Sequence, residues 1–218
     1  MPVRAVIFDL WGTLVPIDPG PWRRTYKRIA RALGVTPEDF RREWSRASDE
    51  RTTGNIARSF RVACAALGVE VSEQETGWAL SLRRSTLDQA FVLREDAVPT
   101  LRALRERGYL TALLTNCDSD VPDVCSRSPL AGMMDVEVFS CCEGLMKPDA
   151  RIYRLAAERL GVPSSECLFV GDGASDELPG AEAIGMRAVL LQALDTSPPL
   201  GWTGTTISNL REVLAQVG

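Results

Sequence analysis

Short apolar runs recur along the chain and are separated by longer stretches with helical periodicity. The first run covers residues 3–9, is rich in β-branched side chains, and ends at a turn that contains Gly12. Later runs of the same character lie at residues 109–115, 135–140, 167–171 and 187–191. Short runs bounded by turn residues predict buried strands, so we expect a strand at each of these positions.

Amphipathic helical stretches lie between the apolar runs from residue 92 onward. They cover residues 97–107, 149–160 and 177–184, and a last one covers residues 209–217. Regular alternation of strands and helices is typical of a parallel sheet with helices on both faces. The pattern therefore predicts an α/β fold with a doubly wound parallel sheet, and the last helix is expected to pack on its edge.

Residues 18–90 contain no predicted strand and several predicted amphipathic helices. The apolar and aromatic side chains of the first helix fall on one face: Trp22, Tyr26, Ile29, Ala30 and Leu33. The pair Thr36-Pro37 and the capping-box segment 72–75 mark the starts of later helices. We therefore predict two units, a core of residues 1–17 and 91–218 and a helical insert of residues 18–90.

The overall composition is that of an ordinary globular protein. The 218 residues are 45% hydrophobic, and 25 Lys and Arg against 29 Asp and Glu give a net charge of −4. This balance provides no general attraction to nucleic acid or to acidic membrane surfaces, so a small molecule is the expected partner. Residues 18–90 carry 13 basic and 10 acidic side chains (+3), which leaves 12 and 19 (−7) for the core. A basic insert beside an acidic core suits an anionic substrate, and solvated helix faces explain the same charges.

Histidine is absent, and the cysteines are not spaced for metal binding. With 0 His, the chain lacks Ser-His-Asp and Cys-His nucleophile activation and every histidine-ligated metal site. The 6 cysteines show no CxxC spacing and no density typical of a secreted disulfide protein, so reduced thiols are expected. We see no basic leader and no apolar run of membrane-spanning length, which predicts a cytoplasmic protein. Catalysis is then expected to use carboxylates, lysine, hydroxyls, thiols or a hard metal ion.

Two carboxylates directly follow predicted strands. Asp9 comes after the first strand, and Asp172 follows the strand at residues 167–171, with Asp176 and Glu177 a few residues further on. In an open α/β sheet, ligands bind at the carboxyl ends of the strands. Mg²⁺ prefers one or two carboxylates together with water and phosphate oxygens. Each aspartate alone is equally typical of a turn or a helix cap, but the two together favour a metal site.

Thr115, Asn116 and Lys147 are further candidates for contact with an anion. Thr115 ends a predicted strand and Asn116 follows it, so a hydroxyl and an amide are available to a phosphoryl oxygen. Lys147 precedes Pro148 and Asp149, which mark a helix start and fix the backbone beside the lysine. Thr-Asn turns and surface lysines are both common, so each of these signals is weak by itself.

Four segments together resemble the motifs of the haloacid dehalogenase-like (HAD) superfamily. FDLWGTL resembles the first motif, LLTN the second, the lysine of GLMKPDARIY the third and VGDGASDELPGA the fourth. Their order, their places at strand ends and the helical insert after the first motif are also similar to that family. The resemblance implies a Rossmann-like core with an inserted α-helical cap, and it implies a hydrolase.

The resemblance also implies roles for the residues of the four motifs. Asp9 would be the nucleophile that forms a covalent intermediate. Lys147 would pair with Asp9 and with the substrate anion. The residues that would hold the transferred group or contact the substrate are Gly12, Thr13, Thr115 and Asn116. The implied substrate is a small phosphorylated molecule.

A magnesium site is implied by the same resemblance. Asp9, Asp172 and the backbone carbonyl of Trp11 would bind Mg²⁺. The fourth motif would supply one more acidic ligand. Alignment on Gly180-Ala181 favours Glu177 for this position, with Asp176 as the alternative.

Trp11 departs from the usual pattern of the family. Its phosphatases usually have a second aspartate at this position, which protonates the leaving oxygen and then activates water. An indole can do neither, because its N–H only donates a hydrogen bond. We therefore expect a phosphatase that is slow or that prefers good leaving groups, unless Asp18 or Glu143 substitutes for the missing acid.

Trp11 also leaves other functions open. Haloacid dehalogenases have an aromatic tyrosine at this position, but they replace the Gly-Asp pair that this chain retains as Gly171-Asp172. Phosphonate hydrolases lack the second aspartate and use a cap lysine, and the insert contains only Lys27. A Mg²⁺-dependent phosphohydrolase is therefore our first hypothesis. A dehalogenase-type hydrolase is the second, and a weakly active phosphate-binding or regulatory protein is the third.

Overall fold

A parallel sheet forms the centre of the structure, a computed structural model that describes residues 2–192 and 201–218. The strand order is β3-β2-β1-β4-β5-β6. The strands are β1 (Ala5–Phe8), β2 (Leu110–Thr115), β3 (Val136–Phe139), β4 (Cys167–Gly171), β5 (Arg187–Leu191) and β6 (Thr205–Ile207). All neighbours pair in parallel, which confirms the predicted doubly wound α/β sheet. Because the order reverses at β1, the carboxyl end of β1 is the place where such sheets bind ligands.

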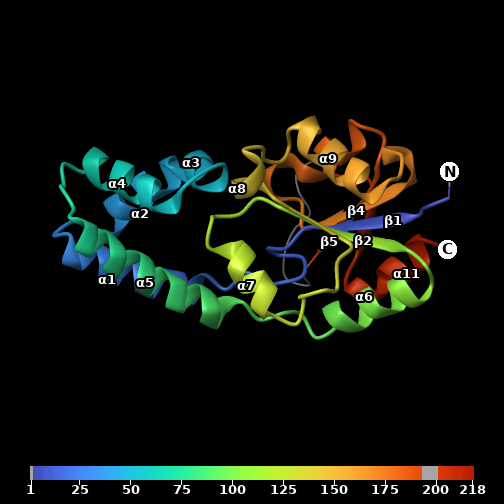
Figure 1. The fold of residues 1–218 in the computed structure, drawn as a ribbon, viewed down its shortest axis with the longest axis horizontal. Coiled ribbons are helices and arrows are strands. Elements are labelled where there is room, and N and C mark those ends of the chain that lie inside the picture. Colours follow the sequence, from blue (N-terminus) through green and yellow to red (C-terminus); the bar gives the residue numbers. More distant parts are fainter. Residues whose placement is uncertain (1, 193–200) are drawn as a thin grey trace.

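Helices cover both faces of this sheet (Figure 1). They are α6 (Ala97–Glu106), α7 (Val121–Arg127), α8 (Ser140–Glu143), α9 (Ala150–Leu160), α10 (Glu177–Glu182) and α11 (Val213–Gln216), with short 3-10 turns at Ser164–Glu166, Ala174–Asp176 and Leu210–Glu212. Alternate residues of β1 face opposite ways. Val6 and Phe8 pack in the cluster that includes α6 and α11, whereas Ala5 and Ile7 pack in the cluster that includes α9 and α10. Burial on both faces explains why the strands read as continuous apolar runs.

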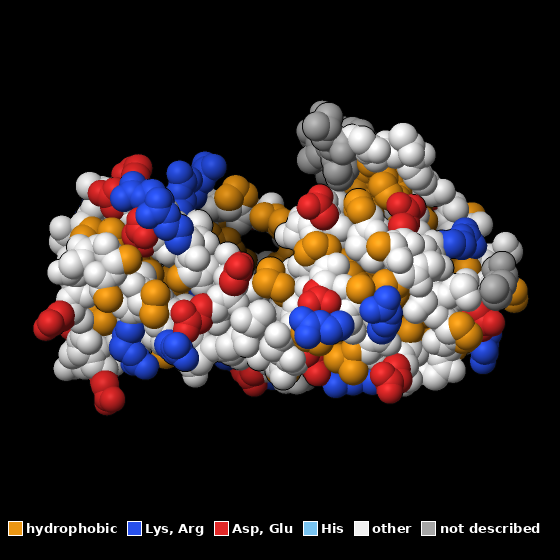
Figure 2. Space-filling view, turned by 90° about the horizontal axis from the view of Figure 1, so that it is seen from above, with side chains coloured by type: hydrophobic (Ala, Val, Ile, Leu, Met, Phe, Trp, Pro, Cys, Tyr) orange, Lys and Arg blue, Asp and Glu red, His pale blue; other side chains and the backbone are white. Residues whose placement is uncertain are grey.

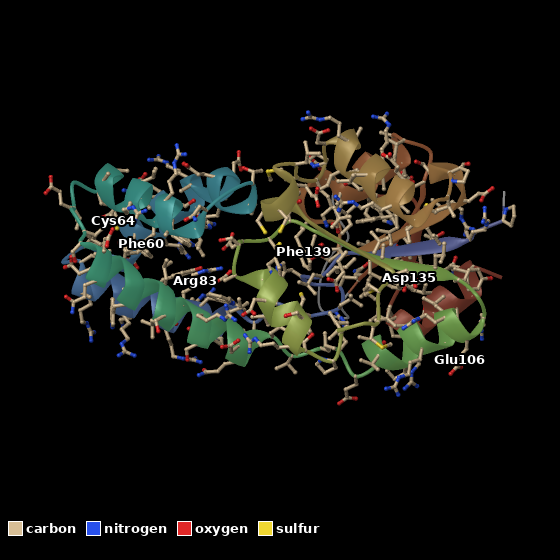
Figure 3. The ribbon with its side chains drawn as sticks, in the orientation of Figure 1. Phe60, Cys64, Arg83, Glu106, Asp135 and Phe139 are labelled. Atoms are coloured by element: carbon tan, nitrogen blue, oxygen red, sulfur yellow. The ribbon has the colours of Figure 1, made fainter. Side chains whose placement is uncertain are left out.

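The segment between β1 and α6 is helical, as the sequence predicts. Its helices are α1 (Pro19–Ala32), α2 (Pro37–Arg46), α3 (Ser48–Thr52), α4 (Ile56–Ala66) and α5 (Glu73–Ala90). They lie to one side of the sheet (Figure 1) and share a hydrophobic cluster that includes Phe40, Trp44, Phe60 and Cys64. Figure 3 shows Phe60 and Cys64 on α4, inside this cluster. The helical insert therefore has a packed interior of its own.

The predicted helix starts are confirmed by their capping hydrogen bonds. The Thr36 side chain accepts the Asp39 N–H, and Pro37 occupies the first turn of α2. Ser72 and Glu75 form both hydrogen bonds of a capping box at α5. These local interactions satisfy N–H groups that have no partner within the helix.

Two C-terminal features differ from expectation. β6 was not predicted, because its three residues are mostly polar and lie at the edge of the sheet, where periodicity gives little signal. The helix expected at 209–217 is a 3-10 turn, Leu210–Glu212, followed by the short α11. Leu210 and Val213 are buried against the sheet, so the predicted packing at this end is present although the helix is shorter. None of the described helices combines the length and apolar character needed to cross a membrane.

Candidate active site

The structure places Asp9 and Asp172 side by side at the carboxyl ends of neighbouring strands. Asp9 follows β1 and Asp172 follows β4, and these strands pair in the register Phe8↔Val170. The Asp9 N–H donates to the Val170 carbonyl at 2.9 Å, which continues the ladder to the start of the loop. Asp9 is buried, whereas Asp172 is partly exposed. Strand pairing therefore brings together two carboxylates that are far apart in the sequence.

Lys147 is a buried cation between two carboxylates. Its Nζ donates to Asp9 Oδ1 at 2.5 Å and to Glu177 Oε2 at 2.5 Å. The Lys147 side chain is only 3% exposed, and those of Asp9 and Glu177 are 7% and 2% exposed. A lysine so buried is rare unless it is paired, so this is no surface lysine. The pairing with Asp9 is the arrangement expected from the sequence, and the pairing with Glu177 was not foreseen.

Burial controls the ionisation of this cluster. Loss of hydration raises the pKa of Asp9 above its usual range, although the Lys147 ammonium opposes the rise. Loss of hydration likewise raises the pKa of Glu177 to about 8, again against the attraction of Lys147. Burial would lower the pKa of Lys147, but Asp9 and Glu177 outweigh it and hold that pKa above its ordinary value. The carboxyl groups of Asp9 and Glu177 therefore hold their protons more readily than exposed ones.

Gly12 brings the loop after β1 close to Asp172. Its φ of +78° is a left-handed conformation that favours glycine, and a Cβ built at Gly12 would lie 2.0 Å from Asp172 Oδ2. Asp172 Oδ1 in turn accepts the Ala174 N–H at 3.0 Å. Because Gly12 has no side chain, its backbone can lie against Asp172. The sequence did not reveal this role.

Glu177, and not Asp176, points into the site. The Glu177 carboxylate accepts the Gly173 N–H at 3.0 Å through Oε1 and faces Lys147 through Oε2, whereas Asp176 is exposed. The backbone makes this turn with left-handed residues at Ser175 (φ 56) and Asp176 (φ 52). Such conformations are unfavourable for residues with a side chain, so the surrounding contacts must maintain them. The arrangement favours Glu177 over Asp176 as the second acidic residue of the fourth motif.

Asn116 positions Lys147 through its side chain. Its Nδ2 donates to the Lys147 carbonyl at 2.9 Å, and its Oδ1 accepts the Lys147 N–H at 2.7 Å. The side-chain amide expected to hold a substrate group is thus engaged with the backbone of the lysine. Thr115 is fully buried, and its hydroxyl donates a long 3.4 Å hydrogen bond to the Asn116 carbonyl. The Thr13 hydroxyl is also buried and has no hydrogen-bond partner.

Trp11 and Trp22 line a cavity next to the acidic cluster. The cavity has a volume of about 320 Å³, lies between the sheet and the helical insert, and includes Asn116 in its lining. The surface is hollowed between these two parts of the molecule (Figure 2). Trp11 packs edge-on against Phe91, with ring centroids 5.8 Å apart. Of the tryptophans in the insert, Trp22 is therefore the one that lines this cavity, which meets the candidate active site at Trp11 and Asn116 and not at the acidic side chains themselves.

A buried set of ion pairs connects the helical insert to the loop after β2. Arg83 projects from α5 (Figure 3), and its guanidinium pairs with Asp118 at 2.5 Å and with Asp120 at 3.3 Å. Arg51 on α3 pairs with the other oxygen of Asp118 at 3.4 Å. These residues were not singled out from the sequence, because arginines in amphipathic helices usually lie on solvated faces and give no local signal.

Three thiols lie close together, and one of them, Cys117, lines the cavity. Cys117 follows Asn116, and its Sγ is 3.8 Å from that of Cys141, which is 3.9 Å from that of Cys142. All six cysteines are free. The hydrogen bond with Cys141 and burial raise the pKa of Cys117, which makes it a poor nucleophile.

The acidic cluster has the composition of a magnesium site. Oxygens of Asp9, Asp172 and Glu177 lie within 4.8 Å of one another, and within residues 2–192 and 201–218 no other group of three candidate ligands does so. All three offer the hard oxygen donors that Mg²⁺ prefers. With one lysine among three carboxylates, a divalent cation would balance the charge. In the loop after β1, the Gly12 N–H donates to the Val15 carbonyl and the Val15 N–H donates to the Leu10 carbonyl. Neither bond uses the Trp11 carbonyl. The residues present therefore fit Mg²⁺.

The known proteins that resemble this chain include both phosphatases and haloacid dehalogenases. Residues 3–185 match the model of haloacid dehalogenase-like hydrolases. Phosphatase MT3486 of Mycobacterium tuberculosis is 32% identical, over 88% of this chain and 88% of its own. (S)-2-haloacid dehalogenase 1 of Pseudomonas sp. is 29% identical, over 89% of this chain and 86% of its own. The crystal structure of a HAD phosphatase from Thermococcus onnurineus shares the fold, with a TM-score of 0.72, 23% identity and coverage of 99% and 98%.

Proposed function

The chain belongs to the haloacid dehalogenase-like hydrolases, and from that premise we propose that it is a magnesium-dependent phosphohydrolase that acts through Asp9. The observation that carries the proposal is the position of Asp172 beside Asp9, with Lys147 paired to Asp9. A carbon-centred dehalogenation needs no metal, whereas phosphoryl transfer benefits from a cation that neutralises the phosphoryl oxygens. Retention of Asp172 therefore favours a phosphate ester as the substrate.

Asp9 is the nucleophile in this proposal. One carboxylate oxygen attacks phosphorus, and an aspartyl phosphate forms as the leaving oxygen departs. Lys147, held in place by Asn116, orients Asp9 and attracts the substrate anion. Bound Mg²⁺ would neutralise negative charge at the phosphoryl group. Asp9, Asp172 and the Trp11 carbonyl would hold it, with Glu177 as the further acidic residue.

We assign the unpaired hydroxyl of Thr13, together with the hydroxyl of Thr115, which has only one long hydrogen bond, to the transferred phosphoryl group. Both side chains are fully buried. A buried hydroxyl without a partner is costly, and a phosphoryl oxygen would satisfy it. This role does not require the Asn116 side chain, which is occupied by Lys147.

We also propose that residues 18–90 act as a cap over the core of residues 1–17 and 91–218. The cavity beside Trp11 lies where the two parts meet, and excluding water there would protect phosphoryl transfer. The substrate in this proposal is a small phosphorylated molecule, neither a nucleic acid nor a membrane. The +3 charge of the insert supports an anionic substrate.

A second candidate is a dehalogenase-type hydrolase. The aromatic side chain of Trp11 and the 29% identity to a haloacid dehalogenase favour it. In that reaction Asp9 would displace halide from carbon, without a metal.

The test measures phosphate release from p-nitrophenyl phosphate with and without MgCl₂. We expect magnesium-dependent release by the wild type and none by Asp9→Asn, with Asp176→Asn as a matched exposed control that stays active. Chloride release from 2-chloropropionate without metal would support the dehalogenase instead. If neither product appears, the third hypothesis, a phosphate-binding protein, replaces both.

A further inference from the structure

The cavity between the sheet and the helical insert offers mainly apolar surface to a ligand. Trp11 lies on the core side, Trp22 and Tyr26 come from α1, and Leu87 and Val121 are among the other apolar residues of the lining. The Trp22 and Tyr26 rings lie 6.0 Å apart and are tilted by 31°. A volume of about 320 Å³ is at the small end of the range for ligand pockets. The cavity suits one small flat group.

The carboxylate, hydroxyl, amide and guanidinium groups in the lining already have partners within the chain. Asp18 accepts the Gly20 N–H, Thr52 donates to the Ser48 carbonyl, and Asn116 is bonded to Lys147 at both side-chain atoms. Arg83 is paired with Asp118. A polyhydroxylated substrate would have few free groups to bind, and its hydroxyls would lose hydration without replacement.

The charges of the lining disfavour a second anionic group on the substrate. Arg83 is the cation among the lining residues, and Asp118 and Asp120 neutralise it. Asp18 and Asp118 are the acidic residues of the lining. The part of the substrate that enters the cavity is therefore expected to be uncharged.

Trp11 adds an independent constraint on the leaving group. A tryptophan at this position cannot protonate the leaving oxygen. The two carboxylates that could replace the missing acid have other partners, since Asp18 accepts the Gly20 N–H at the start of α1 and Glu143 is paired with Arg159. We therefore take the leaving oxygen to depart as an anion. A phenol has a pKa of about 10, as in tyrosine, and leaves readily in this form. An alkyl alcohol is closer to water, with a pKa of about 15.7, and leaves poorly without an acid. The same side chain thus removes the acid and adds apolar surface.

We infer that the substrate is the phosphate monoester of a small, uncharged aromatic hydroxyl compound. The inference rests on the proposed phosphohydrolase function. Asp9 forms the new O–P bond, the P–O bond to the ring breaks, and the aryloxide leaves with the electron pair and takes a proton from water. Water then attacks phosphorus and regenerates the Asp9 carboxylate, with its proton going to solvent. The balance is an aryl phosphate and water converted to a phenol and inorganic phosphate.

Three esters separate the effect of the leaving group from the effect of the apolar cavity. Phenyl phosphate and benzyl phosphate have similar flat rings, but only the first leaves as a phenoxide. Benzyl phosphate and glycerol phosphate both leave as alkoxides, but only the first has an apolar body. We expect kcat/KM with Mg²⁺ to follow the order phenyl, benzyl, glycerol, with phenyl exceeding benzyl by about 100-fold, since general acid catalysis is worth about that much or more.

Two variants test which residue causes each of the two substrate preferences. Trp11→Asp restores a carboxyl group, so the phenyl-to-benzyl ratio should fall by about tenfold or more. Trp22→Ala removes apolar surface, so the benzyl-to-glycerol ratio should fall by about tenfold. Trp78→Ala is the matched control, because Trp78 is 38% exposed on α5 and does not line the cavity. If Trp22→Ala does not fold, Trp22→Leu provides the same comparison with less loss of packing.

The outcomes are distinguishable. A preference for glycerol phosphate over phenyl phosphate, or a Trp22→Ala variant that behaves like Trp78→Ala, overturns the aromatic substrate and leaves the phosphohydrolase intact. Absence of phosphate release from all three esters overturns the phosphohydrolase itself, and the inference with it.

Discussion

At the scale of single residues, the site depends on how closely the loop after β1 can approach Asp172. Gly12 allows this approach in two ways, since it adopts φ +78° and has no side chain where Asp172 lies. The Asp172 carboxylate occupies the space that a Cβ would take. One missing methyl group therefore controls where a candidate metal ligand sits.

Replacement of Gly12 tests this role. Gly12→Ala and Gly34→Ala should each lose about 1–2 kcal/mol of stability, because both positions are left-handed. Only Gly12→Ala should weaken Mg²⁺-dependent activity, by about 100-fold, because misplacing a reacting or binding group by about 1 Å costs that much. A Cβ at Gly34 meets nothing within 4 Å, which makes it the matched control. Urea unfolding and magnesium titrations measure the two effects, and equal kinetics for both variants would contradict the prediction.

At the scale of elements, α5 is held against the core by charge as well as by apolar packing. Leu87 packs in the main core cluster, and Arg83 lies over the Trp22 ring while it pairs with Asp118. Asp118 is close to Asn116, which positions Lys147. The loop after β2 therefore contacts the insert through Asp118 and supports the candidate active site through Asn116.

Arg83→Met should destabilise the protein by about 2–4 kcal/mol, because it leaves Asp118 and Asp120 partly buried without their main counter-charge. Arg84→Met, the neighbouring control, removes more exposed pairs with Asp88 and Asp123 and should cost under about 1 kcal/mol. Urea unfolding measures both. Equal losses would show that the buried pair has no special weight.

At the scale of the whole molecule, the sheet topology concentrates acidic side chains at one end of β1. Three carboxylates and one lysine meet there, in a core whose charge is −7 against +3 for the insert. Carboxylates this close repel one another when they ionise, and a bound cation would relieve that repulsion. Magnesium is therefore expected to stabilise the folded chain, beyond any effect on activity.

At a free Mg²⁺ concentration of ten times Kd, the free energy of unfolding should rise by about 1.4 kcal/mol. Thermal unfolding with MgCl₂ or with EDTA measures the shift. Asp172→Asn should abolish the shift, and Asp176→Asn, an exposed neighbour, should retain it. A shift that survives in Asp172→Asn would place the metal elsewhere.

Much of the site was predictable because the strands and their polar ends are local features. Asp9, Thr115 and Asp172 each follow or end an apolar run, and parallel pairing brings such positions to one edge. The contacts among their neighbours were not predictable. Asn116 binds the backbone of Lys147, and the left-handed turn at Asp176 directs Glu177 inward, and neither produces a pattern in hydrophobicity.

By itself, the sequence determined the alternation of strands and helices, the helical insert and the helix starts at Thr36 and Ser72, because periodicity and capping act over a few residues. It also determined that residue 11 provides no acid, since that depends on side-chain chemistry alone. Only the tertiary structure decided that Lys147 lies between Asp9 and Glu177, that Trp22 faces the cavity and that Arg83 is neutralised. These depend on distances between segments remote in sequence, which are fixed by packing of the whole fold.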